Sequence, residues 1–224
     1  MNTTTLKNLT IATSLATFLA LAGCSKAPEA TAQAQDTVKK AAATVMNYDA
    51  IGIPSGTYEL EKTHGYVFFS YSHFGLSNPH LRFRDIDASI ELDAENLEKS
   101  SVSATIQSAS IDSGVDIFDE HLNSEGWFDT AKHPEITFKS TGFKRATQTT
   151  GTMTGDMTIM GITKPVTFDV TLLAAMEHPR SKKPVMGLEG SGTVLRSDFG
   201  LGKYAPNVSD EVEIGITGEF ILAE

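Results

Sequence analysis

The stretch Asp85-Ile86-Asp87-Ala88-Ser89-Ile90-Glu91-Leu92 decides the fold class of this chain. Its apolar residues occupy every second position, and acidic or hydroxyl side chains fill the positions between them. Because successive side chains of a β-strand point to opposite faces, this pattern predicts a strand with one apolar face and one solvated face. An amphipathic helix would instead repeat its apolar residues every three or four positions.

The same two-residue period returns along most of the chain. Further predicted strands span residues 66–73, 101–106, 135–143, 151–160, 166–172, 184–195 and 211–222, with turn-prone segments between several of them. Residues 116–123 depart from this period and predict a short helix. About eight antiparallel strands make either a two-sheet sandwich or a closed barrel, whose interior holds side chains alone or one small ligand. The period does not separate these two architectures.

The composition excludes several classes of function. The chain has 224 residues, with 18 Lys and Arg against 28 Asp and Glu, and a formal net charge of −10. An acidic surface without a Lys/Arg cluster repels phosphate backbones, so we expect no nucleic-acid partner. The only cysteine is Cys24, so the rest of the chain has no thiol for a disulfide, a metal site or a nucleophile. We expect a single domain stabilised by packing.

The N-terminal segment has the layout of a secretory signal. Lys7 precedes an apolar and hydroxyl-rich run over residues 9–22, which is too short to span a bilayer comfortably. The run ends in Leu21-Ala22-Gly23-Cys24, which resembles the lipobox of bacterial lipoproteins. In that class the signal is removed before the cysteine, which becomes the acylated first residue. The alternative is an incidental cysteine in a leader that is discarded.

The lipoprotein resemblance implies three regions and a location. Residues 1–23 are the predicted signal peptide, 24–54 the lipidated N-terminus with a flexible tether rich in Ala, Thr, Gln and Lys, and 55–224 the folded domain. We expect the protein on the periplasmic side of the bacterial cell envelope, held at a membrane through several acyl chains on Cys24. Ser25 stands where lipoproteins of the inner membrane often carry Asp, which favours the outer membrane.

The folded domain resembles the YceI-like family of bacterial periplasmic proteins. Residues 117–129, 133–141, 155–166 and 196–200 carry the resemblance, which runs in the family's order from about Tyr58 to Phe220. It implies an all-β, lipocalin-like antiparallel β-barrel of about eight strands with a short helix near one mouth. It also implies that the apolar interior takes the tail of a long polyisoprenoid or of an isoprenoid quinone.

Five positions depart from the family's pattern. Glu61 and Gly65 stand where the family usually has Asp and Ser, and Leu81, Ala88 and Phe118 stand where it often has Gly, Gly and Arg. These changes add bulk and remove a charge near the expected mouth. The head group of the ligand is therefore less defined than its tail.

The apolar phase of the strands supplies the predicted ligand lining. Alternating aliphatic residues are most often plain core, but a hydrocarbon tail in a hollow barrel would gain about 25 cal/mol for each Å² withdrawn from water. The predicted lining residues are Phe68, Ile86, Ile90, Val102, Ile106, Ile136, Phe138, Met157, Ile159, Phe168, Val170, Ile214 and Ile216. The predicted polar residues at the mouth are Asp119, His121, Arg196 and Asp198.

The sequence predicts a binding protein rather than an enzyme. It has no His-Glu-x-x-His, Gly-x-Ser-x-Gly, Gly-x-Gly-x-x-Gly or P-loop motif, so we expect no catalytic residue, no metal and no cofactor other than the bound lipid. The predicted role is transport, storage or stress protection involving that lipid. The alternatives are a structural or partner-docking module of the envelope, and an enzyme acting on a lipid head group. Whether the barrel acts alone or as a homodimer stays open.

Overall fold

The structure is a computed structural model that describes residues 51–223. The predicted signal peptide, Cys24 and most of the predicted tether lie outside the described residues. The described elements are the strands β1 (Gly56–Ser70), β2 (His80–Phe83), β3 (Ile86–Leu92), β4 (Ser101–Gln107), β5 (Ile111–Asp112), β6 (Glu135–Arg145), β7 (Thr150–Ile159), β8 (Ile162–Glu177), β9 (Pro184–Leu195) and β10 (Glu211–Leu222), the helix α2 (Asp116–Asn123) and the 3-10 turns η1 (Leu97–Lys99), η2 (Ser108–Ser110) and η3 (Arg196–Phe199).

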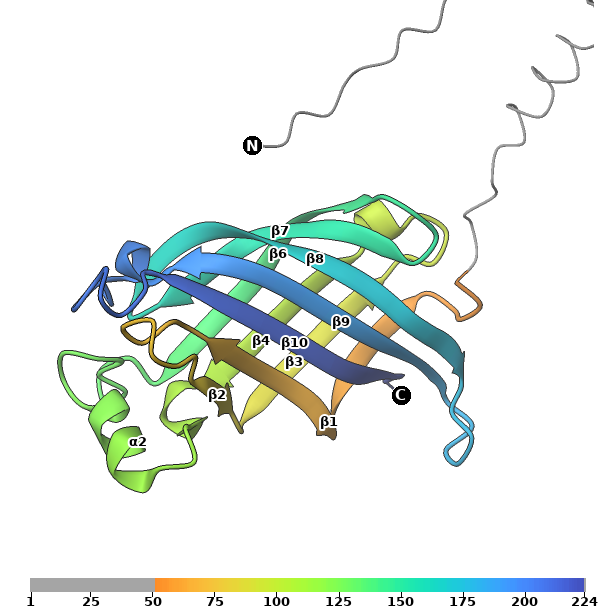
Figure 1. Ribbon diagram of the computed structural model, residues 1–224. Coiled ribbons are helices and arrows are strands. Elements are labelled where there is room, and N and C mark those ends of the chain that lie inside the picture. The colour runs from red at the N-terminus through yellow and green to blue at the C-terminus, as the bar shows by residue number, and fades with distance from the viewer. Residues whose placement is uncertain (1–50, 224) are drawn as a thin grey trace, which may run out of the picture. The chain divides into compact units, whose positions relative to one another are not determined.

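Eight antiparallel strands close into a barrel (Figure 1). Their order around the barrel is β1, β3, β4, β6, β7, β8, β9 and β10, and β10 pairs again with β1. The long strand β1 makes this closure, because it pairs with β10 along one edge and with β3 and then the short β2 along the other. The predicted lipocalin-like barrel is confirmed, and the closing pair excludes the sandwich.

Strand β1 begins at Gly56, whereas the predicted strand begins at residue 66. The first half was missed because a bulge interrupts the alternation of the strand. Its register against β10 shifts between Leu60 and Gly65, so the apolar period that predicted a strand over 66–73 is lost before residue 65. Strands β2 and β5 have four and two residues, which is too short for a period to show. Residues 51–54, assigned to the tether from the sequence, pack on the barrel: Ile53 is buried, and the Tyr58 hydroxyl donates to the carbonyl of Pro54 at 2.8 Å.

The side chains inside the barrel gather in three apolar clusters. One, around Tyr58, Phe220 and Met186, fills the end at which β1 begins. A second joins α2 to the barrel through Leu122, which packs with Leu81, Phe83, Ile86, Ile111 and Ile136. A third lies around Phe168 and Phe199. The short helix is therefore held at one end of the barrel by a single buried leucine and its aromatic neighbours (Figure 1).

One close approach in the barrel wall requires a glycine. A Cβ at Gly192 on β9 would lie 2.7 Å from the carbonyl oxygen of Thr167 and 2.8 Å from Cδ1 of the buried Phe168. We expect Gly192→Ala to lower the free energy of unfolding by about 1–3 kcal/mol, because the ring and its strand must shift. Urea denaturation of both proteins measures this difference.

The matched control for this prediction lies two residues away on the same strand. A Cβ at Gly190 would meet nothing closer than 3.6 Å. We expect Gly190→Ala to be neutral or slightly stabilising, since alanine also reduces the entropy of the unfolded chain. Equal stabilities for the Gly190→Ala and Gly192→Ala proteins would contradict the packing described here.

Candidate functional site

The barrel encloses an apolar cavity of about 480 Å³. Its wall consists mainly of Ile, Val, Leu, Phe and Met side chains that point inward from the strands. This volume lies within the range of about 300–1,000 Å³ that is usual for small-molecule sites, and most such sites are similarly apolar. An eight-stranded barrel can be filled by its own side chains, but this one leaves part of its lumen hollow.

Most of the predicted lining residues do face this cavity. They are Ile86, Ile90, Val102, Ile106, Ile136, Phe138, Met157, Ile159, Phe168, Val170, Ile214 and Ile216. Their inward direction follows from the alternation within each strand, because the opposite phase of the same strands is polar and solvated.

The prediction for Phe68 was wrong. Its side chain is 45% exposed on the outer face of β1, where its ring covers Gly215 of the paired strand β10. The inward phase of β1 is instead Val67 and Phe69, and Tyr71 directly after the strand continues it; all three residues line the cavity. Both phases of this strand are apolar or aromatic, so hydrophobicity did not distinguish the two faces.

A second cavity of about 100 Å³ continues the first along the barrel. It is lined partly by Ile51, Leu97 and residues 148–150. Residues 148–150 run from the turn between β6 and β7 into the first residue of β7, and this turn lies at the end of the barrel opposite α2 (Figure 1). The two cavities share five lining residues, namely Ile90, Val102, Met153, Val170 and Leu188. The larger and the smaller apolar chamber are therefore adjacent, and these shared side chains border both of them.

Three segments outside the barrel strands form the mouth of the larger cavity. They are the loop 71–79, the segment 115–128 that contains α2, and the loop 200–209, and we call them together the rim. The two loops are joined by backbone hydrogen bonds, in which Phe74 N donates to Asn207 O at 2.7 Å and Ser209 N donates to Ser72 O at 2.9 Å. The rings of Trp127 and Tyr204 lie 6.2 Å apart and join the helical segment to the loop 200–209.

The aromatic residues of the rim were missed in the sequence as lining residues. Phe74, Trp127, Phe128 and Tyr204 all line the cavity. They lie in loops and turns, where no period indicates which side chains point inward. The only signal was that Trp127 and Phe128 lie within the segment that resembles the YceI-like family.

Of the four predicted polar residues, His121 and Arg196 line the cavity. The His121 Nε2 atom accepts a hydrogen bond from the indole N–H of Trp127 at 2.7 Å. An accepting ring nitrogen carries no proton, so in the neutral ring this contact selects the tautomer with the hydrogen on Nδ1. His121 thus holds the aromatic edge of the mouth.

Arg196 is buried and binds backbone carbonyls rather than a carboxylate. Its guanidinium donates to the carbonyl oxygens of Ser209 (2.8 Å), Lys203 (2.8 Å) and Val208 (2.7 Å), and also to that of Leu201. Burial lowers the pKa of Arg196, and the nearby Asp210 and Tyr71 partly offset this shift. Burial also raises the pKa of the Tyr71 phenol, against the opposing effect of Arg196. Arg196 therefore fixes the loop 200–209 and places a positive charge beside the cavity.

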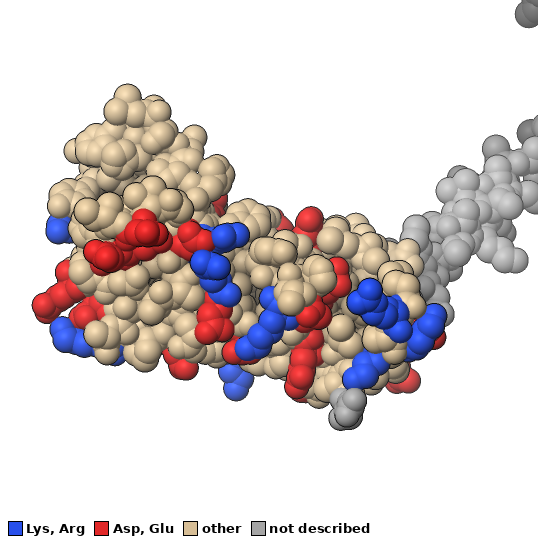
Figure 2. Space-filling view, turned by 90° about the horizontal axis from the view of Figure 1, so that it is seen from below, with Lys and Arg blue, Asp and Glu red and all other residues tan. Residues whose placement is uncertain are grey.

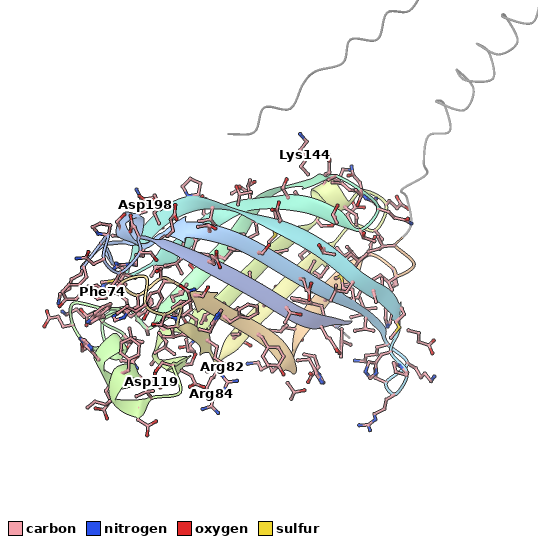
Figure 3. The ribbon with its side chains drawn as sticks, viewed as in Figure 1. Phe74, Arg82, Arg84, Asp119, Lys144 and Asp198 are labelled. Carbon is pink, nitrogen blue, oxygen red and sulfur yellow. The ribbon has the colours of Figure 1, made fainter. Side chains whose placement is uncertain are left out.

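The sequence predicts Asp119 and Asp198 at the mouth, but neither residue lines the cavity. The Asp119 Oδ1 atom accepts hydrogen bonds from the backbone N–H of Ser113 at 2.8 Å and from its hydroxyl at 2.5 Å, and so holds α2 to the segment that directly follows β5. Asp198 is exposed on η3 (Figure 3). The turn η3 buries Arg196 and Phe199 and thereby directs Asp198 outward. The four residues do not form one polar cluster.

The described residues 51–223 offer no group of three or more His, Asp or Glu side chains placed to hold a metal ion. Within the same range, no helix has both the length and the apolar composition that crossing a bilayer requires.

A closed eight-stranded antiparallel barrel with a hollow apolar lumen and a helix at its mouth defines the lipocalin-like class of barrels. Within this class, the chain belongs to the YceI-like family, because the model of the YceI-like domain matches residues 58–220. It is 36% identical over 159 residues to a UPF0312 protein of Azotobacter vinelandii, covering 71% of this chain and 82% of that protein. It is 33% identical over 164 residues to Protein YceI of Escherichia coli, covering 72% and 85%.

Solved structures share the same barrel. BcnA of Burkholderia cenocepacia has a TM-score of 0.65 at 24% identity and covers 71% of this chain and 98% of its own. The YceI protein of Campylobacter jejuni has a TM-score of 0.63 at 27% identity, with 68% and 90% covered. A polyisoprenoid-binding domain of Saccharophagus degradans, described as implicated in plant cell wall breakdown, has a TM-score of 0.57 at 12% identity, with 74% and 98% covered.

Proposed function

We propose that the protein binds a long apolar lipid, of the polyisoprenoid or isoprenoid-quinone type, inside its barrel. The observation that carries this proposal is the hollow apolar lumen of about 480 Å³, which continues into a second apolar chamber. Burial of a hydrocarbon tail contributes about 0.8 kcal/mol for each methylene, so shape and burial alone bind a long tail tightly. The shared fold of the polyisoprenoid-binding domain of Saccharophagus degradans supports the same ligand class.

The polar side chains of the mouth support binding rather than catalysis. The ring of His121 is engaged with Trp127, and the guanidinium of Arg196 is engaged with backbone carbonyls. We therefore propose a carrier or storage protein that shields the lipid from water, with no catalytic residue.

The single tryptophan of the chain provides a direct test. Trp127 lines the cavity, so a bound quinone ring near the mouth would quench its fluorescence. We expect saturable quenching during titration with a decyl-substituted benzoquinone, and displacement of that probe by a long-chain polyprenol. Native mass spectrometry of protein purified gently from its own host should also show a co-purifying apolar molecule. The proposal would be refuted if the purified protein carried no apolar molecule and bound neither the benzoquinone nor the polyprenol.

We also propose that Cys24 carries the lipid anchor and holds the protein at the cell envelope, at the outer membrane. The support is the resemblance of residues 21–24 to the lipobox. We expect Cys24→Ala to abolish incorporation of labelled palmitate and to release the protein from the membrane fraction. The Ser25→Asp protein tests the choice of membrane, since it should move from the outer to the inner membrane on a density gradient. Labelling that persists in Cys24→Ala would exclude this anchor.

A further inference from the structure

Exposed apolar side chains gather on the rim. Leu76 is 86% exposed, Ile117 77%, Tyr204 55% and Phe74 53%. They come from three segments that are far apart in the sequence and meet around the mouth of the cavity. Figure 3 labels Phe74 at this end of the barrel. Scattered exposed apolar residues are ordinary, but a group of them around one opening indicates an interaction surface.

The tip of the loop 71–79 is held in a fixed shape. Phe74 has a φ of 55°, a left-handed conformation that large side chains rarely adopt, and Gly75 follows it with a φ of 68°. Hydrogen bonds from His73 N to Ser77 O (2.9 Å) and from Leu76 N to His73 O (2.9 Å) close the turn. The turn therefore presents Phe74 and Leu76 to solvent without a further loss of backbone freedom on binding.

The charge of the rim differs from that of the whole chain. The loops 71–79 and 200–209 contain no Asp or Glu and only one cation, Lys203, in a chain whose net charge is −10. The rim lies at the left in Figure 1. At that end Figure 2 shows a projecting surface without charged side chains at the upper left, with acidic and basic side chains directly below it. Segment 115–128 is the charged side of the rim, because α2 carries Asp116 and Glu120 beside Ile117.

We propose that the rim docks onto the surface of a lipid bilayer, with the mouth of the cavity facing the membrane. An anionic membrane surface repels the acidic remainder of the protein. It repels the rim less, because two of the three rim segments, the loops 71–79 and 200–209, contain no acidic residue. The Lys203 Nζ atom lies 5.0 Å from the ring centre of Tyr204 and 6.0 Å from that of Trp127. Tyr, Trp and Lys are the residues that settle at the boundary between lipid and water.

The connection between the rim and the lumen also favours a bilayer as the docking partner. Phe74 and Tyr204 are exposed to solvent and line the cavity as well, so an apolar path runs from the outer tips to the interior. A lipid could leave the bilayer along this path without crossing water. The identity of this cargo rests on the proposed function, whereas docking of the rim does not.

Quenching of Trp127 by brominated lipids tests the docking. The full chain is mixed with vesicles of phosphatidylethanolamine and phosphatidylglycerol whose acyl chains are partly dibrominated. Because bromine quenches tryptophan only at contact range, we expect emission to fall relative to vesicles of unbrominated lipid. The variant Leu76→Ser/Ile117→Ser should lose most of this quenching, and neither residue lines the cavity. The matched control Leu173→Ser/Met176→Ser removes two exposed apolar residues from the far end of β8 and should retain it.

A third variant separates docking from lipid uptake, since a brominated lipid inside the lumen would also quench Trp127. The variant Gly190→Phe fills the lumen and leaves the rim intact, so it should still be quenched. Quenching that is lost in Gly190→Phe and kept in Leu76→Ser/Ile117→Ser would overturn the docking while supporting uptake. Unchanged emission in all variants would overturn the docking outright. If Leu76→Ser/Ile117→Ser also turned a dimer into a monomer on size exclusion, the rim would be a contact between two copies instead.

Discussion

The Gly190→Phe protein is expected to remain folded and to lose lipid binding. Gly190 pairs with Val170 on β8 and with Ile216 on β10, and both of these neighbours line the cavity. A Cβ at Gly190 would meet the side chain of Ile216 at an ordinary contact distance of 3.6 Å. Because Gly190 itself lines the cavity, we expect an aromatic ring placed there to extend into the lumen.

The expected loss of affinity is large. A ring that displaces about four methylenes of a tail, each contributing about 0.8 kcal/mol, weakens binding by roughly two orders of magnitude. The fluorescence titration of Trp127 with the decyl-substituted benzoquinone measures this change. Ser191→Phe is the matched control, since Ser191 is the next residue on β9 and its side chain is exposed on the outer face. Unchanged binding by a folded Gly190→Phe protein would show that the lipid does not occupy the lumen.

The Arg196→Met protein is expected to be the least stable of the variants considered. The substitution keeps much of the apolar stem of the side chain but removes the donors to four carbonyl groups of the loop 200–209. Each buried carbonyl left unpaired costs about 1–3 kcal/mol, although water will solvate those that become exposed. We expect the free energy of unfolding to fall by ~3 kcal/mol in urea denaturation.

Amide hydrogen exchange shows where this stability is lost. We expect faster exchange in the loop 200–209 and unchanged protection in β3 and β4 on the other side of the barrel. Arg196→Lys should recover only part of the stability, because one ammonium group cannot reproduce the fork of a guanidinium. A fully stable Arg196→Met protein that no longer binds lipid would assign Arg196 to the ligand rather than to the loop.

The regular strands are the part of the fold that the sequence predicts best. Strand β3 alternates between apolar and polar residues without interruption, so the positions of Ile86 and Ile90 in the lumen follow from the period alone. Strand β1 contains a bulge and has aromatic residues on both faces, and there the same reasoning misplaced Phe68. Alternation predicts a face only where the two faces differ in polarity.

The candidate site is predictable only where it is built from strands. The directions of Arg196 and Asp198 are set by η3, a turn of four residues, and no period extends over so short an element. The exposed positions of Leu76 and Tyr204 depend on how three distant segments meet at the mouth. Neither outcome follows from residue type, because a leucine or a tyrosine in a loop is equally compatible with a buried position.

The pairing of β1 with β10 places the two ends of the folded domain side by side, with Tyr58 opposite Leu222. Both ends lie away from the rim (Figure 1). The chain between the proposed attachment site at Cys24 and residue 51 has a maximal extended length of roughly 90 Å, at about 3.5 Å per residue. The longest strand of the barrel, β8 with 16 residues at about 3.3 Å each, spans roughly 53 Å. A domain attached through Cys24, as proposed above, would therefore have enough reach to present its opening to the same membrane.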